Sequence, residues 1–226
     1  MNFPISELNQ YFNSIDILQG IFSIFGEFGV GKTTFALQTA INSAKMGKEV
    51  VYVYTKHNFP SSKIQILIKN SDEILDKILF IHTTKFSELH KIIFNLEFLL
   101  LSKNKQTFKL IIIDSITNLY RIDLNMEKKE RNYNLNYQLN QMLANLAYLN
   151  EKYGIEIMVV NEMSRKNLGD QIIEVESGGK VMEFWTDKKL KISKTKKLNE
   201  REFLFADGSK NKIMKFISNL REFGFD

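Results

Sequence analysis

One stretch near the N-terminus constrains the chain more than any other: Gly26-Glu27-Phe28-Gly29-Val30-Gly31-Lys32-Thr33-Thr34. It fits the phosphate-binding loop pattern of Gly, four residues and Gly-Lys-Ser/Thr. The glycines allow successive backbone N–H groups to face phosphate oxygens. Lys32 places a cation on the β- and γ-phosphates, and the Thr33 hydroxyl suits a Mg²⁺ ligand. We therefore expect all nine residues to bind a nucleoside triphosphate, with Lys32 also in a catalytic role.

The flanks of this loop have the periodicity that a phosphate-binding loop requires. Residues 21–25 (Ile-Phe-Ser-Ile-Phe) predict a strand entering the loop, and residues 34–40 predict a helix leaving it. The positive N-terminus of such a helix favours a bound anion. The strand–loop–helix order supports ATP as the ligand.

Composition limits the other classes of site. Hydrophobic residues make up 44% of the 226, enough for a substantial core in one domain over residues 1–226. The absence of cysteine excludes disulfides and thiolate-ligated metals, and 3 histidines make a zinc site improbable. Residues 1–12 lack a signal-peptide pattern, and no apolar run reaches the ~20 residues of a membrane span. We expect a cytoplasmic protein without a membrane partner.

Strand and helix patterns alternate along most of the chain. Apolar strands are predicted at residues 49–55, 78–82, 108–113 and 155–160, with helices at 33–45, 86–101 and 133–152. This alternation predicts an α/β fold with a mainly parallel central sheet flanked by helices. Three more strands, expected as antiparallel additions to the sheet edge, are predicted at 188–194, 201–206 and 212–218.

The net charge of +5 is concentrated in the last fifth of the chain. Residues 1–179 hold 19 basic and 19 acidic side chains, whereas residues 180–226 hold 12 and 7. A basic patch can attract nucleic acid or another acidic partner. A solvated, lysine-rich strand surface explains the same count, and both interpretations stay open.

A second nucleotide signal follows the loop by about 80 residues. The apolar run at 110–113 ends in Asp114, which is where a protein with a phosphate-binding loop places the carboxylate that orients Mg²⁺. We expect Thr33 and Asp114 to serve as the metal-binding pair. Alone this pattern is weak, because many parallel strands end in an acid.

Three segments resemble the RecA-like recombinases, and in particular the archaeal RadA and RadB group and its paralogues. They are Asp-Ser-Ile-Thr-Asn-Leu-Tyr-Arg (114–121), Val-Val-Asn-Glu-Met (159–163) and Gly-Gly-Lys-Val-Met-Glu-Phe-Trp (178–185). They are similar to the family's Asp-Ser-Val/Leu-Thr-Ala-Leu-Tyr-Arg, Val-Thr-Asn-Gln-Val and Gly-Gly-Arg-Val-Leu-Glu-Tyr-Trp. The resemblance implies a RecA-like P-loop NTPase core with ATP and Mg²⁺ as cofactors. Few residues precede the first strand, so we expect no N-terminal helical DNA-binding domain, which favours a RadB-like paralogue.

Two positions depart from the family pattern. The family's second strand ends Asp-Thr-Glu-Gly, and its Glu polarises the attacking water; here Lys56 takes that place. The family's γ-phosphate-sensing Gln corresponds to Glu162, which we consider as a replacement base or a partner of Lys56. A lysine is not a base suited to this site. We therefore expect ATP to be bound but hydrolysed slowly or not at all.

The resemblance also implies DNA contact through loops at 121–132 and 164–177. The first holds four basic and three acidic residues, and the second lacks an aromatic residue on which a base could stack. We expect modest binding of single-stranded DNA. The candidate contacts are Arg121, Arg131, Arg165 and Lys166.

Three functions remain open at this level. The favoured one is an accessory factor in homologous recombination and DNA repair, acting near the nucleoid with the main recombinase or another paralogue. The first alternative is a regulatory nucleotide switch of another assembly, such as the RecA-like ATPase of the archaeal motility motor. The second is an active DNA-stimulated ATPase that forms filaments by itself. Whether the protein forms a homo-oligomer also stays open.

Overall fold

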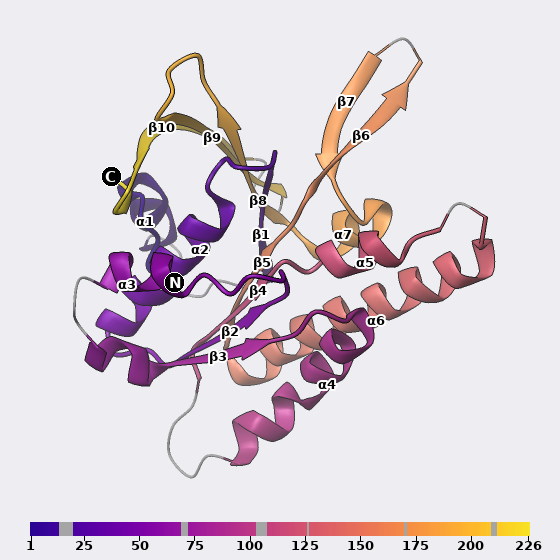
Figure 1. Cartoon of the computed structure of the whole chain (residues 1–226), viewed down its shortest axis with the longest axis horizontal. Coiled ribbons are helices and arrows are strands. Elements are labelled where there is room, and N and C mark those ends of the chain that lie inside the picture. The colour runs from indigo at the N-terminus through magenta and orange to yellow at the C-terminus, as the bar shows by residue number, and fades with distance from the viewer. Residues whose placement is uncertain (14–19, 69–71, 103–107, 126, 170, 209–211) are drawn as a thin grey trace.

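A nine-stranded sheet runs through the part of the chain that the computed structural model describes, residues 1–13, 20–68, 72–102, 108–125, 127–169, 171–208 and 212–226. Its strands are β1 (Ile21–Gly26), β2 (Val50–Tyr54), β3 (Ile78–His82), β4 (Leu110–Asp114), β5 (Glu156–Val160), β8 (Lys188–Lys194), β9 (Glu200–Asp207), β10 (Lys212–Arg221) and β11 (Gly224–Phe225). They lie in the order β11-β10-β9-β8-β1-β5-β4-β2-β3 (Figure 1). The strand that enters the phosphate-binding loop therefore lies inside the sheet, between β5 and β8.

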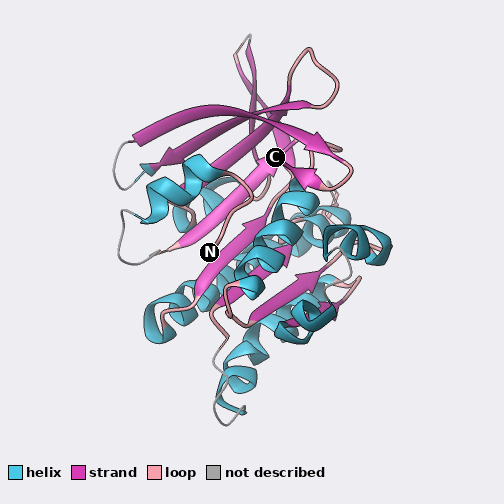
Figure 2. Cartoon of the chain, turned by 90° about the vertical axis from the view of Figure 1, so that its left-hand side faces the viewer, coloured by secondary structure: helices cyan, strands magenta, loops and turns pink. Residues whose placement is uncertain are grey.

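Helices cover both faces of this sheet. One face packs against α1 (Ser6–Asn13), α2 (Lys32–Lys45) and α3 (Ser61–Ile68). The other packs against α4 (Phe86–Ser102), α5 (Asn118–Asp123), α6 (Lys129–Tyr153) and α7 (Gly179–Trp185). A 3₁₀ helix, η1 (Asp72–Lys77), precedes β3. Figure 2, turned by 90°, shows the helices gathered along the sheet and the C-terminal strands at its upper end.

The central strands are apolar throughout because both of their faces are buried. In β2, Val50 and Tyr52 join the core cluster on the α2 side, whereas Val51 and Val53 join the cluster on the α4 and α6 side. Successive side chains of a strand point to opposite faces, so a strand with two covered faces needs a continuous apolar run. This explains why these strands could be predicted from the sequence.

The expected fold class is confirmed, with adjustments at element ends. Strand β8 has the predicted bounds, and α6 begins four residues earlier than expected. Strands β9 and β10 are antiparallel additions, as predicted, and β11 is a further antiparallel strand that was not expected. Strand β8 differs, because it pairs parallel with β1. The reason is the connection between β5 and β8: the chain crosses over through α7, and a strand that follows such a crossover enters the sheet in the parallel direction.

Two segments that were expected to be loops contain regular structure. Residues 118–123 form α5. Most of the second predicted DNA loop is a hairpin of β6 (Met163–Leu168) and β7 (Gln171–Glu176), which stands away from the main sheet in Figure 1. Its mixed polar and apolar sequence lacks the strong alternation that would have identified two strands.

Candidate nucleotide-binding site

The predicted phosphate-binding loop joins β1 to α2, and its glycines are required by close contacts. At Gly31, φ is +103°, and a Cβ atom would lie 2.8 Å from Phe225 Cζ and 2.9 Å from Leu220 Cδ2. At Gly26, a Cβ atom would overlap the carbonyl of Ile192 on β8. The loop is thus packed from below by the C-terminal strands. Phe28, at its tip, is 93% exposed.

Lys32 is buried under the loop, and carbonyl oxygens of the loop accept its hydrogen bonds. Its Nζ donates to the carbonyl oxygens of Gly26 at 2.7 Å and Glu27 at 2.9 Å. The same atom pairs with Glu162 Oε2 at 3.2 Å. Burial lowers the pKa of Lys32, and the charge of Lys56 adds to the effect, although Glu162 and Asp114 oppose it. This ammonium therefore already has three oxygen partners.

Lys56 stands between the two predicted metal ligands. Its Nζ donates to Thr33 Oγ1 at 3.2 Å and lies 3.6 Å from Asp114 Oδ1. It also lies 3.8 Å from Glu162 Oε1. Burial lowers the pKa of Lys56, but Asp114, Glu162 and Tyr54 outweigh it, so the net pKa is raised. Lys56 is therefore a fixed positive charge at this position.

Asp114 is fully buried at the end of β4 and has one oxygen committed to the protein. Its Oδ2 accepts a hydrogen bond from the Tyr52 hydroxyl at 2.9 Å. Burial and then Asp114 raise the pKa of Tyr52 well above its usual value, so the phenol stays a donor. Within the described part of the chain, Asp114 Oδ1 accepts no hydrogen bond, and it faces Lys56. A carboxylate oxygen left this way is suited to a cation.

Mg²⁺ does not fit between Thr33 and Asp114 while Lys56 stays in place. The metal binds oxygen at about 2.0–2.1 Å. An ion at that distance from Thr33 Oγ1, on the side of Asp114, would meet the ammonium of Lys56, which is like-charged. The oxygens of Thr33 and Asp114 suit the metal, but the ammonium of Lys56 does not.

Backbone contacts explain why Lys56 reaches this cluster. Thr55 Oγ1 donates to the Ser115 carbonyl at 2.9 Å and accepts from the Ser115 amide at 2.8 Å. His82 Nε2 donates to the Lys56 carbonyl at 2.8 Å. The ends of β2, β3 and β4 are therefore tied together at the carboxyl edge of the sheet. A side chain that follows β2 must lie beside Asp114, which ends β4.

Glu162 is positioned by the end of β5 and the base of the hairpin. Its amide donates to Thr117 Oγ1 at 3.3 Å, and its carbonyl accepts from the Ser177 amide at 2.9 Å. The preceding Asn161 donates from its amide to the Ile24 carbonyl on β1 at 2.7 Å. Glu162 thus faces the loop from the neighbouring strand, between the two lysines.

Two of the four predicted DNA contacts lie beside the loop. Arg121 and Arg165 are exposed and line a cavity of about 370 Å³ together with Gly26, Glu27, Phe28, Glu162 and Met163. Arg131 lies elsewhere, on α6, and pairs with Asp123 at 3.3 Å. Lys166 lies on β6 opposite Ile173, and its side chain is outside the described residues.

The basic tail is partly neutralised within the molecule. Lys189 pairs with Glu176, Lys191 pairs with Glu174 at 2.8 Å, and further tail pairs are Lys197–Glu200 and Lys215–Glu202. These pairs favour the interpretation of the tail as a solvated strand surface over a dedicated nucleic-acid patch.

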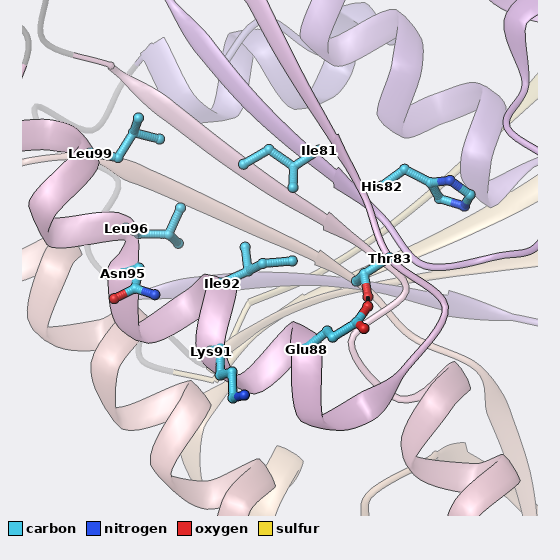
Figure 3. Close-up of a pocket in the computed structure, with 9 residues that line it drawn as sticks. All are labelled: Ile81, His82, Thr83, Glu88, Lys91, Ile92, Asn95, Leu96 and Leu99. Atoms are coloured by element: carbon cyan, nitrogen blue, oxygen red, sulfur yellow. Dashed lines mark hydrogen bonds between the residues drawn. The ribbon is translucent and has the colours of Figure 1, made fainter.

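A second cavity, of about 430 Å³, lies at the far edge of the sheet between β3 and α4. Ile81, Ile92, Leu96 and Leu99 supply apolar side chains to it, and His82, Thr83, Glu88, Lys91 and Asn95 complete its lining (Figure 3). Strand β3 pairs with β2 on one side, and it ends the order of the described strands on the other. An open strand edge thus runs beside an apolar hollow.

Comparison with known proteins identifies the family. The family model of Rad51 matches residues 11–207. The chain belongs to the Rad51 family of RecA-like recombinases. It resembles proteins named "DNA repair and recombination protein RadB". The one from Methanococcus maripaludis is 30% identical over 204 residues, which are 88% of this chain and 89% of the relative. The one from Methanocaldococcus jannaschii is 30% identical over 167 residues, 74% of each chain.

Membership of the Rad51 family confirms the resemblance drawn from the three segments and the loop. This family is one of nucleotide-binding proteins, and its core is the RecA-like domain seen in the sheet order. In the described part of the chain, no helix is long and apolar enough to cross a membrane.

Sequence reasoning missed several residues around the site. Nothing in the sequence indicated that Tyr52 would hold Asp114, or that Phe225 would pack under Gly31. Tyr52 belongs to a strand whose residues are all buried, so its hydroxyl gave no separate signal. Lys56 was detectable only as a departure from the family pattern.

Proposed function

We propose that this Rad51-family chain binds ATP at the loop from Gly26 to Thr34 and holds it more than it hydrolyses it. The observation that carries the proposal is a set of ion pairs at the end of that loop. Lys32 pairs with Glu162, and Lys56 pairs with both Asp114 and Glu162. A backbone turn, a helix N-terminus and two ammonium groups match the needs of a polyphosphate.

Slow hydrolysis follows from the protonation states at the site. Activation of water requires a group that accepts a proton and lies within hydrogen-bond reach of it. Lys56, at the family's base position, is an ammonium with a raised pKa and accepts none. The two carboxylate oxygens of Glu162 face Lys32 and Lys56, which disfavours its use as a base in the free protein.

We propose an accessory role in homologous recombination and DNA repair, which the names of the RadB relatives support. Such a role implies a cytoplasmic, nucleoid-associated protein. Arg121 and Arg165 are the proposed contacts for single-stranded DNA, because both are exposed beside the loop. Two arginines supply only a weak electrostatic contribution. We expect modest affinity that falls with salt.

The main recombinase or another paralogue is the proposed partner, and the β3 edge is the surface that suits it. An extended segment can add as a strand to an open sheet edge and place an apolar side chain in an adjacent pocket. Ile92→Glu, in the cavity beside β3, should weaken capture of a purified recombinase. The control is Ile213→Glu on β10, which is exposed and remote from that cavity. Equal capture by both variants would contradict the β3 assignment.

The central experiment measures binding of single-stranded DNA and turnover of ATP together, in the wild type and in Lys32→Ala. We expect the wild type to bind ATP and to turn it over at a rate well below the ~10 per second of a typical enzyme. We expect Lys32→Ala to lose ATP binding. A turnover of several per second without any partner protein would refute the proposal.

A further inference from the structure

The contacts of Lys56 with Thr33 and Asp114 have a consequence beyond the absence of a catalytic base. Thr33 Oγ1 and Asp114 Oδ1 are the two atoms that would hold a divalent cation, and the Lys56 ammonium contacts both, at 3.2 Å and 3.6 Å. Asp114 is completely buried and its Oδ1 has no hydrogen bond among the described residues. A buried carboxylate needs a compensating charge. Lys56 supplies it.

An ammonium can do the electrostatic part of the work of a metal at this position. It carries three donors, and one of them is directed to Thr33 Oγ1. Its side chain is 31% exposed, so it is reachable by a ligand in the loop. Its backbone is fixed by Thr55 and His82. The charge is therefore present before the nucleotide arrives and stays without a bound ion.

We propose that Lys56 takes the place of the divalent cation, so that this site binds the triphosphate in its metal-free form. The inference rests on the nucleotide binding proposed above and adds which form of the ligand is recognised. Mg²⁺ on the β- and γ-phosphates would meet Lys56 as a second cation on the same oxygens. The site should therefore bind metal-free ATP at least as tightly as Mg-ATP.

The first test uses the wild-type protein and calorimetric titration with ATP, once with excess EDTA and once with excess Mg²⁺. We expect an equal or smaller dissociation constant in EDTA. If Mg²⁺ tightens binding about tenfold or more, the inference is overturned while nucleotide binding stands. If ATP binds under neither condition, both the inference and the proposed function are overturned.

The second test uses Lys56→Met and needs no nucleotide. Removal of the ammonium leaves Thr33 and Asp114 free to bind metal, so Mg²⁺ alone should raise the thermal midpoint of this variant but not that of the wild type. In titrations, Lys56→Met should bind ATP about tenfold more tightly with Mg²⁺ than with EDTA. A variant that ignores Mg²⁺ in both measurements would contradict the inference.

Lys48→Met is the matched control. Lys48 is 32% exposed and pairs with Glu156 at 2.8 Å, so it resembles Lys56 in exposure and in its partner. It lies just before β2, whereas Lys56 lies just beyond the opposite end of that strand. Its loss should leave the response to Mg²⁺ like that of the wild type. If Lys56→Met does not fold, Lys56→Gln, which keeps a polar donor without the charge, takes its place.

Discussion

Replacing Glu162 by Gln separates two effects that most substitutions in a binding site combine. In the free protein, the Glu162 carboxylate lies 3.2 Å from Lys32 Nζ and 3.8 Å from Lys56 Nζ. The γ-phosphate needs the same ammonium groups. The carboxylate therefore stabilises the protein through these ion pairs and competes with the ligand, so the variant should be less stable and bind ATP more tightly.

The magnitude follows from the partners that remain. Lys32 keeps its hydrogen bonds to the carbonyls of Gly26 and Glu27, and Gln retains an oxygen acceptor. A hydrogen bond to a charged group contributes about 1.5–3 kcal/mol, and Glu162 is 15% exposed. We expect the free energy of unfolding to fall by about 1–2 kcal/mol, which lowers the thermal midpoint by about 2–8 °C. If most of that interaction is lost on ATP binding anyway, its removal tightens ATP binding by about tenfold.

The assay is thermal unfolding with and without nucleotide, together with calorimetric titration of ATP and ADP. ATP should gain more affinity than ADP, because only ATP brings a γ-phosphate to the carboxylate. The control is Glu156→Gln, which is 19% exposed and pairs with Lys48 and the N-terminal amine at the opposite end of β5. It should lose stability without a change in affinity. Weaker ATP binding by Glu162→Gln would refute the reasoning.

Three further outcomes are expected. Phe225→Ala removes a buried ring that packs on Phe203 and under Gly31, so urea unfolding should show a loss of about 3–5 kcal/mol; an unchanged midpoint would contradict this packing. Burial, and then Asp207, raise the pKa of Tyr11 to about 12, above the ~10 of an unfolded chain. This raised pKa contributes stability that is complete below pH 10 and lost as the pH rises to 12, so Tyr11→Phe should show a smaller alkaline fall in its urea midpoint. Lys56→Glu combined with Glu162→Gln places a carboxylate at the family's base position, and ATP turnover with Mg²⁺ should rise by about 10²-fold, whereas either single variant should gain less.

The sequence predicted those features that depend on local pattern. The loop, the strands of the central sheet and Asp114 each have a spacing that indicates their role. Contacts between distant segments had no such signal: the pairing of Lys32 with Glu162 and the position of Phe225 under Gly31 depend on which strands become neighbours. The hairpin of β6 and β7 was also missed, because its strands pair with each other outside the main sheet and need no continuous apolar run.

The position of β1 in the sheet bears on how the protein folds. Its neighbours are β5 and β8, which follow it in the chain only after β2, β3, β4 and most of the helices. Contacts this distant in sequence slow folding, because a long loop must close before they form. The loop that follows β1 is thus completed late, by strands from the second half of the chain. Capture of a nucleotide would then report that the whole sheet has assembled, and it would stabilise only that final state.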